Sequence, residues 1–415
     1  MTRISTNMPN IDSQYYLRRQ EERLANVQSQ IGAQSRLLQL RDDPLAASHA
    51  VRYESYIARL ERFESNTLYS QEHLNLTDGY LRQTNDILQR LRDLSVQGAN
   101  GVYTQQDMRY MAVETNELLK ELVSISNALG PDGRQLFAGD RSFSEPFRVI
   151  EGVVEGSEEP VIAAVEYRGA GASRKAEISE GVYGELDLSG GEAFWAEKMQ
   201  VFSSFDASDY RVASAGAFYI DGQEITVNAS DTVRVIASKI NESAAPVKAY
   251  IDPETNGLAL EGTSAHLIRV EDASGSSVMR DLGVITRSAE AGAPNWNSSA
   301  KVSGGSIFDM VIRLRDGLFR GDTDFIGTQG IGGIDFALNN VQKNLAEVGS
   351  RAERAAQTWG RINEEIPNVT AALTRETGLD FAAAATDLSM LDFAHKAALQ
   401  TASKVLSTTL LDYLR

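Results

Sequence analysis

The residues that could do chemistry in this chain are its acidic side chains and its four histidines, because cysteine is absent. Without cysteine the chain has no disulfides, thiolate nucleophiles or cysteine-ligated metals. The histidines are scattered, and none lies in a His-Glu-x-x-His or His-x-His pattern, so we expect no zinc site. These residues are His49, His73, His266 and His395, and we expect them at surface or helix-seam positions.

Motifs for nucleophilic or phosphate chemistry are also missing from the sequence. No Gly-x-Ser-x-Gly elbow or G-x-x-x-x-G-K-[ST] loop is present, and the acidic residues form no framed catalytic pair. The run Gly327 to Gly333 holds four glycines, but no strand or Lys/Ser signature frames it, so we predict a plain loop. The sequence therefore predicts a protein that is not an enzyme and has no cofactor. Catalytic carboxylates need no local motif, so a stalked enzyme or adhesin stays as an alternative.

An adjacent acidic pair, Asp42 and Asp43, could in principle hold a metal. Pro44 follows this pair, and proline is favoured at the first position of a helix, where its missing N–H costs nothing. Asp43 is then in place to cap that helix through its side chain. We therefore interpret the pair as a helix start and predict no metal.

Composition narrows the possible partners. The 415 residues carry a formal net charge of −17, with a pI near 4.8. A nucleic-acid-binding protein needs clustered Lys and Arg, and we find no such cluster, so nucleic acid is not an expected partner. No segment reaches the roughly 18 apolar residues of a transmembrane helix, and no signal peptide is evident. These rules alone predict a cytoplasmic chain without membrane insertion, although a non-classical export route would leave no such mark.

Helical seams near both ends of the sequence organise the chain. From Asn340 to Leu373, apolar residues alternate at steps of four and three, the spacing of a left-handed coiled coil. They are Val341, Leu345, Val348, Ala352, Ala355, Trp359, Ile362, Ile366, Val369 and Leu373. So narrow a stripe has to face another helix. Pro367 lies inside this run, where it removes a backbone hydrogen bond and is expected to kink the helix.

Candidate partner helices precede and follow this stretch. Between Ile11 and Gln39 a seam repeats every seven residues, at Leu17, Leu24, Ile31 and Leu38. Leu45 to Gly98 is predicted to form one long helix, with Leu60, Leu74, Leu81 and Leu88 in heptad register, and a third helix runs through Met108 to Leu129. After Gly378 a last helix carries Leu388, Leu391, Ala398, Ala402 and Val405 on one face, widened by Leu399, Leu406 and Leu410.

The middle of the chain has a different pattern, typical of strands. Between Arg211 and Gly262, two short strands flank Asp221-Gly222, a strong hairpin signal. Residues 230–232 are expected to cap a helix that runs through Ile240, and strands at 247–251 and 258–260 surround Asn256-Gly257. This part of the chain is therefore predicted to be β-rich.

Together these elements predict an α+β fold, in which the N- and C-terminal arms form a long antiparallel helical coiled coil and a β-rich middle domain is inserted. The expected divisions are an N-terminal arm at 1–44, the first half of a helical rod at 45–140, and a β-rich domain at 141–300 with a repeat at about 211–262. The second half of the rod at 301–376 and a C-terminal arm at 377–415 complete the chain.

Several motifs, in this order, resemble the flagellin superfamily and are more similar to the hook-filament junction family, hook-associated protein 3, than to filament flagellin. In the N-terminal half they are Arg3-Ile4-Ser5-Thr6-Asn7-Met8, Asp42-Asp43-Pro44-Leu45-Ala46-Ala47-Ser48, Leu94-Ser95-Val96-Gln97-Gly98-Ala99-Asn100-Gly101 and Asp132-Gly133-Arg134-Gln135-Leu136-Phe137-Ala138-Gly139. In the C-terminal half they are Ser306-Ile307-Phe308-Asp309, Val348-Gly349-Ser350-Arg351 and Leu410-Leu411-Asp412-Tyr413-Leu414. The segment from Ala217 to Leu260 is similar to the repeat of the family's variable middle region.

The resemblance implies a structural adaptor of the bacterial flagellum, exported by the flagellar type III apparatus to an external or periplasmic flagellum. It implies hook-associated protein 1, flagellin and an export chaperone as partners, and self-association in a ring. Filament flagellin is the alternative. From their amphipathic spacing, we hypothesise an inter-subunit core made of Ile4, Leu17, Leu24, Leu399, Val405, Leu406, Leu410, Leu411 and Leu414. A seam formed only within the chain would explain the same spacing.

Overall fold

The computed structural model describes residues 8–140, 144–157, 159–171, 173–286 and 295–411, with the side chains of the first and last helices described between 14 and 403. The chain divides into two compact units. The terminal unit comprises Met1–Glu64 and Gly360–Arg415, and the central unit comprises Ser65–Trp359. Two long helices contribute residues to both units.

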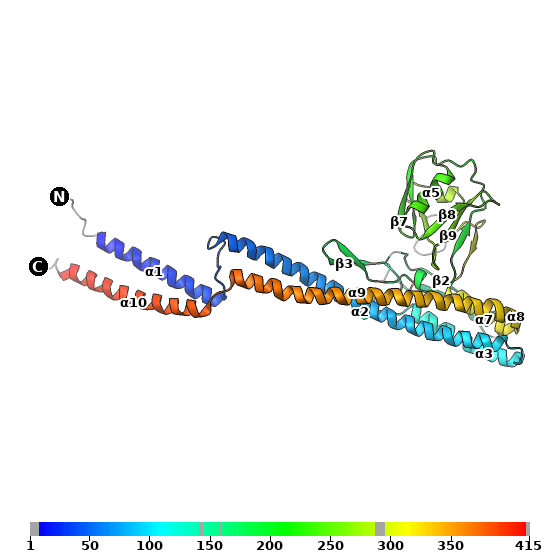
Figure 1. Cartoon of the computed structure of the whole chain (residues 1–415), viewed down its shortest axis with the longest axis horizontal. Helices are drawn as coiled ribbons and strands as arrows, with labels where there is room; N and C mark the ends of the chain where they lie inside the picture. Colours follow the sequence, from blue (N-terminus) through cyan, green and yellow to red (C-terminus); the bar gives the residue numbers. More distant parts are fainter. Residues whose placement is uncertain (1–7, 141–143, 158, 172, 287–294, 412–415) are drawn as a thin grey trace. The chain divides into compact units, whose positions relative to one another are not determined.

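The described chain is mainly helical (Figure 1). Its long helices are α1 (Met8–Ala33), α2 (Pro44–Ala99), α3 (Gln105–Ser126), α7 (Ile307–Arg320), α9 (Ile331–Thr377) and α10 (Phe381–Leu411). Shorter ones are α4 (Gly190–Ala193), α5 (Val233–Glu242), α6 (Val278–Asp281), α8 (Thr323–Phe325) and the π-helix η1 (Ile326–Gly330).

Between α3 and α7 the described chain forms antiparallel strands in four sheets. The sheets are β1-β2, β3-β4, β10-β6-β7 and β11-β5-β9-β8. The strands are β1 (Phe147–Gly152), β2 (Val161–Tyr167), β3 (Lys175–Ser179), β4 (Val182–Glu185), β5 (Gln200–Phe202), β6 (Gly216–Ile220), β7 (Gln223–Val227), β8 (Val247–Ile251), β9 (Leu258–Gly262), β10 (Val270–Asp272) and β11 (Lys301–Ser303).

Side-chain caps fix where the helices begin. Oδ1 of Asp43 accepts a hydrogen bond from the Ala46 backbone N–H at 3.1 Å, so the predicted cap of α2 is present. Helices α3 and α7 start with reciprocal capping boxes, Thr104 with Asp107 and Ser306 with Asp309. These caps satisfy backbone donors that have no partner inside a helix.

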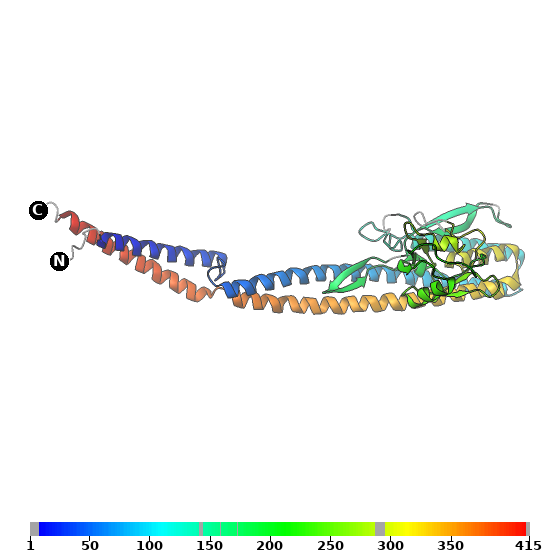
Figure 2. The same ribbon diagram turned by 90° about the horizontal axis from the view of Figure 1, so that it is seen from above.

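The predicted seams are buried against other elements. Leu74, Leu81 and Leu88 of α2 are almost fully buried in one core with Val341 and Val348 of α9. In the terminal unit, Leu60 and Phe63 of α2 form a small cluster with Ile362 of α9. Both views show α1 lying along α10 and α2 along α9 (Figures 1 and 2). The fold is therefore an antiparallel pairing of N- and C-terminal helices with a β-rich segment inserted between them.

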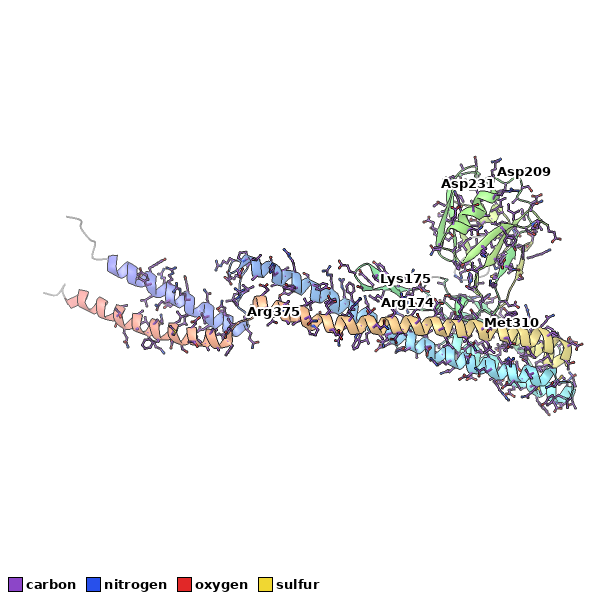
Figure 3. All side chains as sticks on the ribbon, in the orientation of Figure 1. Arg174, Lys175, Asp209, Asp231, Met310 and Arg375 are labelled. Atoms are coloured by element: carbon purple, nitrogen blue, oxygen red, sulfur yellow. The ribbon has the colours of Figure 1, made fainter. Side chains whose placement is uncertain are left out.

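The expected loop at Gly327 to Gly333 is wrong. This segment is η1 continuing directly into α9. Its glycines allow close packing of helices, since a Cβ on Gly333 would lie 2.7 Å from Sδ of Met310, which Figure 3 labels. A Cβ on Gly98 of α2 would likewise lie 2.6 Å from Leu318.

The first helix is also shorter than predicted. It ends at Ala33, and Gln34 takes a left-handed φ of 53°, so Leu38 lies outside the helix whose heptad it continues. Helix α9 runs as one helix through Pro367, the residue where the sequence predicts a kink.

The two β hairpins confirm their turn signals. Asp221 and Gly222 join β6 to β7 with positive φ at both positions, as a two-residue hairpin turn requires. Asn256, also at positive φ, precedes β9. Helix α5 begins after Thr232 as predicted, but the Thr232 side chain makes no capping hydrogen bond.

Two histidines lie deeper than expected. His73 on α2 has 4% exposure and His266 has 6%. Nε2 of His73 is 2.7 Å from Oδ1 of Asp187, an ion-pair contact without hydrogen-bond geometry. His266 lies in the β-rich segment, at neither a surface nor a helix seam, so the prediction is wrong for this residue. A carboxylate partner from elsewhere in the chain, Asp187 for His73 and Asp221 for His266, explains why each imidazole is tolerated.

Candidate assembly surface

The terminal unit contains a helix pair with almost no core of its own. Helix α1 packs against α10, yet among the described side chains of these two helices only Ala384 is buried. The seam of α1 is half-buried at Leu17, Leu24 and Ile31. On α10 it is half-buried at Leu388, Leu391, His395, Ala398 and Ala402. A seam this thin stabilises the pair only weakly, since helix pairs owe most of their stability to buried apolar area.

A second apolar stripe runs along α10, facing away from this seam. It consists of Thr386, Met390, Phe393 and Ala397, at steps of four, three and four, and we name it the outer stripe. Met390 is 66% exposed and Phe393 is 76% exposed. A helix that is apolar on two opposite faces normally has neighbours on both. The outer stripe is therefore a surface that lacks a partner within the described chain.

Helix α1 has the opposite character on its exposed side. Arg18, Arg19, Glu21, Glu22 and Arg23 are all exposed to solvent. Aromatic residues appear only near the start of its described part, where the rings of Tyr15 and Tyr16 meet edge to face with centroids 5.8 Å apart. One helix of the pair thus presents charge and the other presents apolar side chains. This asymmetry makes α10 the apolar side of the pair.

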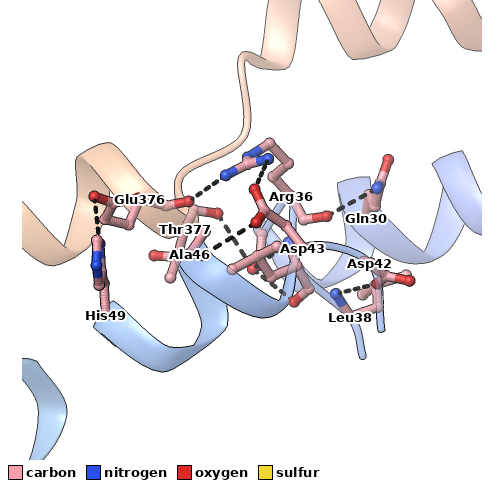
Figure 4. A network of polar contacts seen from close by, with 11 residues as sticks. Gln30, Arg36, Leu38, Asp42, Asp43, Ala46, His49, Glu376 and Thr377 are labelled. Carbon is pink, nitrogen blue, oxygen red and sulfur yellow. Dashed lines mark hydrogen bonds and ion pairs between the residues drawn. The ribbon is translucent and has the colours of Figure 1, made fainter. Parts of the chain in front are cut away.

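A polar joint connects the helix pair to α2 and α9 (Figure 4). The backbone N–H of Arg36 donates to the Thr377 carbonyl at 2.8 Å, and its guanidinium donates to the Glu376 carbonyl at 2.9 Å. The same guanidinium lies 3.2 Å from the Asp43 carboxylate. The Ala46 N–H and then Arg36 hold the pKa of Asp43 below its usual range. The breaks between α1 and α2 and between α9 and α10 are thereby fastened together.

The structure places the predicted interface residues on different faces. Leu17 and Leu24 belong to the half-buried α1 seam, whereas Leu399 is 46% exposed beside the α10 seam. Val405, Leu406, Leu410 and Leu411 lie in the last turns of α10, but their side chains are outside the described set. Ile4 and Leu414 lie outside the described residues altogether. The side chains of three of the nine predicted residues are therefore described, and among these three only Leu399 is exposed.

Residue spacing could have revealed Met390 and Phe393 as well. From Phe381 to Ser403 the only Asp, Glu, Lys or Arg residues are Asp387, Asp392 and Lys396. None of these lies in the outer stripe. Following a single heptad seam around the helix hides a second apolar face, because the seam explains only one side.

The described residues offer little support for other kinds of site. Among them, no helix has a stretch long and apolar enough to cross a membrane. Within the same residues, no group of three or more His, Asp or Glu side chains could hold a metal ion.

Three family models match this chain. The bacterial flagellin N-terminal helical region matches residues 4–142, and the bacterial flagellin C-terminal helical region matches residues 331–414. The flagellin hook IN motif matches residues 218–264, which contain the β6–β7 hairpin, α5 and strands β8 and β9. Together the three models cover well over half of the sequence.

Curated relatives match over shorter stretches. Flagellin FlaB1 of Treponema pallidum (strain Nichols) is 32% identical over 111 residues, which are 27% of this chain and 39% of that protein. Flagellar hook-associated protein 3 of Salmonella typhimurium is 24% identical over 164 residues, which are 40% of this chain and 52% of that protein. The chain thus matches about half or less of the length of these relatives.

Among solved structures, the chain is similar to flagellar hook associated protein-3 from Legionella pneumophila. The superposition has a TM-score of 0.45 and 18% sequence identity, and it covers 78% of this chain and 97% of the other.

Proposed function

Because this chain belongs to the flagellin superfamily, whose members are structural components of the bacterial flagellum, we propose that it is an adaptor at the junction between hook and filament. Its terminal helices assemble with neighbouring copies, and the inserted β-rich segment decorates the assembly. In this role the protein is structural and not an enzyme.

The observation that carries the proposal is the outer stripe of α10. Met390 and Phe393 expose large apolar side chains on a helix that already has an apolar seam against α1. Burying such side chains contributes about 1.5–3 kcal/mol each, so a neighbouring copy that covers the stripe stabilises a helix pair lacking its own core. Assembly and ordering of the terminal unit are then the same event.

The residues that form the interface follow from this arrangement. We assign the inter-subunit core to the outer stripe, to Leu399, to the last turns of α10 with Val405, Leu406, Leu410 and Leu411, and to Leu414 beyond that helix. Leu17 and Leu24 hold α1 to α10 within one subunit, and Ile4 stays a proposed interface residue outside the described residues. In this division, contacts between subunits explain part of the heptad spacing, and a seam within one subunit explains the rest.

The partners in this proposal are hook-associated protein 1 on the hook side, flagellin on the filament side and further copies of this chain in a ring. An export chaperone covers the C-terminal segment before assembly, and the flagellar type III apparatus exports the chain. A loosely held helix pair suits export because little folding free energy is lost when it opens.

Filament flagellin is the second candidate, and one observation favours it. Identity to Flagellin FlaB1 is 32%, higher than the 24% to hook-associated protein 3, although over fewer residues. The junction role is supported by that longer alignment and by the closing Leu410-Leu411-Asp412-Tyr413-Leu414, since filament flagellins more often lack the Asp-Tyr step.

Electron microscopy of flagella from a strain that lacks this gene tests the proposal. We expect hooks without filaments and flagellin monomers in the medium. Intact filaments would contradict the junction role. Two results together would identify this chain as the flagellin. The strain would lose the filament without secreting another flagellin, and wild-type filaments would contain this chain in high copy number.

A further inference from the structure

The central unit holds two hydrophobic cores, and we call the region where they meet the waist. One core lies among α2, α3, α7, α9 and the β1-β2 sheet, which we call the helical base. The other lies among strands β5 to β11 with α5 and α6, which we call the inserted β domain. Leu267 packs against both cores, and its backbone N–H donates to the Gly191 carbonyl of α4 at 2.9 Å. The segment Ser264 to Arg269 therefore forms much of the waist.

Cavities surround this segment. A cavity of about 250 Å³ lies on the side of Trp195 and Trp296, and one of about 390 Å³ on the side of Glu192 and Arg351. Another, of about 300 Å³, lies beside Arg269 and Tyr219. Among the described residues, Leu267 is the one partly buried apolar side chain that packs against both cores, so polar contacts beside the cavities also help to fasten the two parts.

His266 is the polar group at the centre of the waist, and both its ring nitrogens face acceptors. Nδ1 lies 2.9 Å from the Ser264 carbonyl oxygen and Nε2 lies 3.2 Å from Oδ2 of Asp221. The Ser264 hydroxyl is farther, at 3.4 Å from Nδ1. A neutral imidazole has only one N–H, so only the doubly protonated ring donates to both the carbonyl and the carboxylate.

Asp221 and Glu192 come from opposite sides of the waist, and both line the cavity that His266 lines. Asp221 is at the β6–β7 turn of the inserted β domain, and Glu192 is on α4 of the helical base. Burial lowers the pKa of His266, but Asp221, the Ser264 carbonyl and Glu192 outweigh burial and raise it overall. Burial and then Glu347 raise the pKa of Glu192. The other charged groups around the cavity are Lys175, Glu185, Arg269, Lys343, Glu347 and Arg351.

We propose that His266 is a proton-dependent latch that fastens the inserted β domain to the helical base. With the ring protonated, its positive charge lies between Asp221 and Glu192 and compensates both. With the ring neutral, one of the two acceptors, the Ser264 carbonyl or the Asp221 carboxylate, loses its donor, and the two carboxylates lose the positive charge that compensates them. The latch therefore holds at lower pH and opens as pH rises through the His266 pKa.

The sign follows from linkage. A histidine whose pKa is raised by the closed state stabilises that state fully below its ordinary pKa, and this stabilisation is lost as pH rises through the raised value. The pKa of Glu192 is also raised, by burial and then by Glu347, so its contribution has the same sign.

Hydrogen exchange of the full chain between pH 5 and pH 9 tests the latch, with rates corrected for intrinsic exchange. The reporter is the Leu267 amide, whose hydrogen bond crosses the waist. We expect its protection to fall with rising pH. The total fall should be about tenfold for each unit by which the pKa of His266 in the closed state exceeds its pKa in the open state. The titration of selectively labelled His266 is expected to follow the same midpoint.

Variants separate a latch from a purely structural histidine. His266→Gln is expected to remove the pH dependence of Leu267 protection, whereas His49→Gln, in the terminal unit, is expected to leave it unchanged. Glu192→Gln is expected to preserve protection at high pH, since the half-buried carboxylate that a neutral His266 leaves uncompensated is gone. A flat pH profile in the wild-type chain would overturn the proposal, whatever the variants do. The test makes no use of flagellar assembly, so it is independent of the proposed function.

Discussion

At the scale of single residues, a second buried ionic cluster ties α2 to the chain after β4. Asp187 is 1% exposed and accepts hydrogen bonds from Arg174 at 2.5 and 2.8 Å, while His73 approaches from α2. Arg174 is labelled beside the rod in Figure 3. Burial raises the pKa of Asp187, but His73 and Arg174 lower it by more. The carboxylate is therefore ionised and required where it lies.

Asp187→Asn is expected to lower the free energy of unfolding by about 3–5 kcal/mol, because it leaves the buried His73 and the partly buried Arg174 without the carboxylate that contacts them. An acid whose pKa is depressed by folding stabilises the fold above its ordinary pKa and loses that effect as pH falls. The free energy of unfolding, measured with urea, should therefore fall less between pH 7 and pH 4 in the variant than in the wild-type chain. Asp209→Asn, at an exposed position, is the control and should change neither value.

Alanine substitutions at two glycines are expected to change the stability of the chain in opposite directions. A Cβ on Gly190 would lie 2.7 Å from the Phe147 and Tyr167 rings and 2.8 Å from the Phe137 carbonyl, so Gly190→Ala should cost about 1–3 kcal/mol. A Cβ on Gly349, inside α9, would meet nothing within 4 Å, so Gly349→Ala should stabilise by about 0.5–1 kcal/mol. Urea unfolding midpoints check both. Equal effects of the two substitutions would show that helix propensity alone governs them.

For single residues, the sequence predicts contacts between close neighbours in the chain but not contacts between distant residues. Asp43 could be identified as a cap because its role depends on Pro44 and Ala46, close by in the chain. The partners of His73 and His266 are 114 and 45 residues away, Asp187 and Asp221, and only the fold brings them together. Local pattern therefore finds caps and turns but not buried ion pairs.

At the scale of elements, the capping box of α3 sets the start of a helix whose inner face is buried. Oγ1 of Thr104 accepts from the Asp107 N–H at 3.3 Å, and the Asp107 carboxylate accepts from the Thr104 N–H at 3.0 Å. Thr104→Ala should destabilise the chain by about 1 kcal/mol, and Thr104→Ser, which keeps the hydroxyl, by much less. Thermal melting followed by circular dichroism distinguishes them. Identical melting of both variants would show that the cap contributes nothing.

Helical elements were predictable where a seven-residue repeat is buried on one face. Leu74, Leu81 and Leu88 met this condition, and so did the stripe through Val341 and Val348. The segment from Gly327 to Gly333 was mistaken for a loop because glycine is a poor helix former. There the close approach of Met310 outweighs propensity. Tertiary packing of that kind leaves no local mark in the sequence.

At the scale of the whole molecule, the two units differ in how much they bury. The central unit holds both large cores, whereas the buried residues of the cluster in the terminal unit are Leu60, Phe63 and Ile362. Large exposed side chains are nonetheless frequent in the terminal unit, at Tyr15, Tyr16, Leu40, Leu45, Val51, Phe381, Met390, Phe393 and Leu399. Exposed apolar surface on this scale indicates an interaction surface.

Phe393→Asp tests whether other copies cover that surface. Phe393 is 76% exposed in the single chain, so an aspartate there should leave folding and helix content unchanged. In an assembly that covers the outer stripe, the same aspartate becomes a buried unpaired charge, which costs about 3–5 kcal/mol for each subunit. We expect a strain carrying this variant to export the protein but to lack filaments on most hooks.

The matched control is Tyr183→Asp on β4 of the central unit, where the tyrosine is 64% exposed. It replaces an exposed aromatic side chain with the same acid but lies outside the terminal unit. Electron microscopy and swimming assays of the two strains, with circular dichroism of the purified proteins, give the comparison. Normal filaments in the Phe393→Asp strain would mean that the outer stripe remains uncovered, and the inter-subunit core would then have to lie elsewhere on the terminal helices.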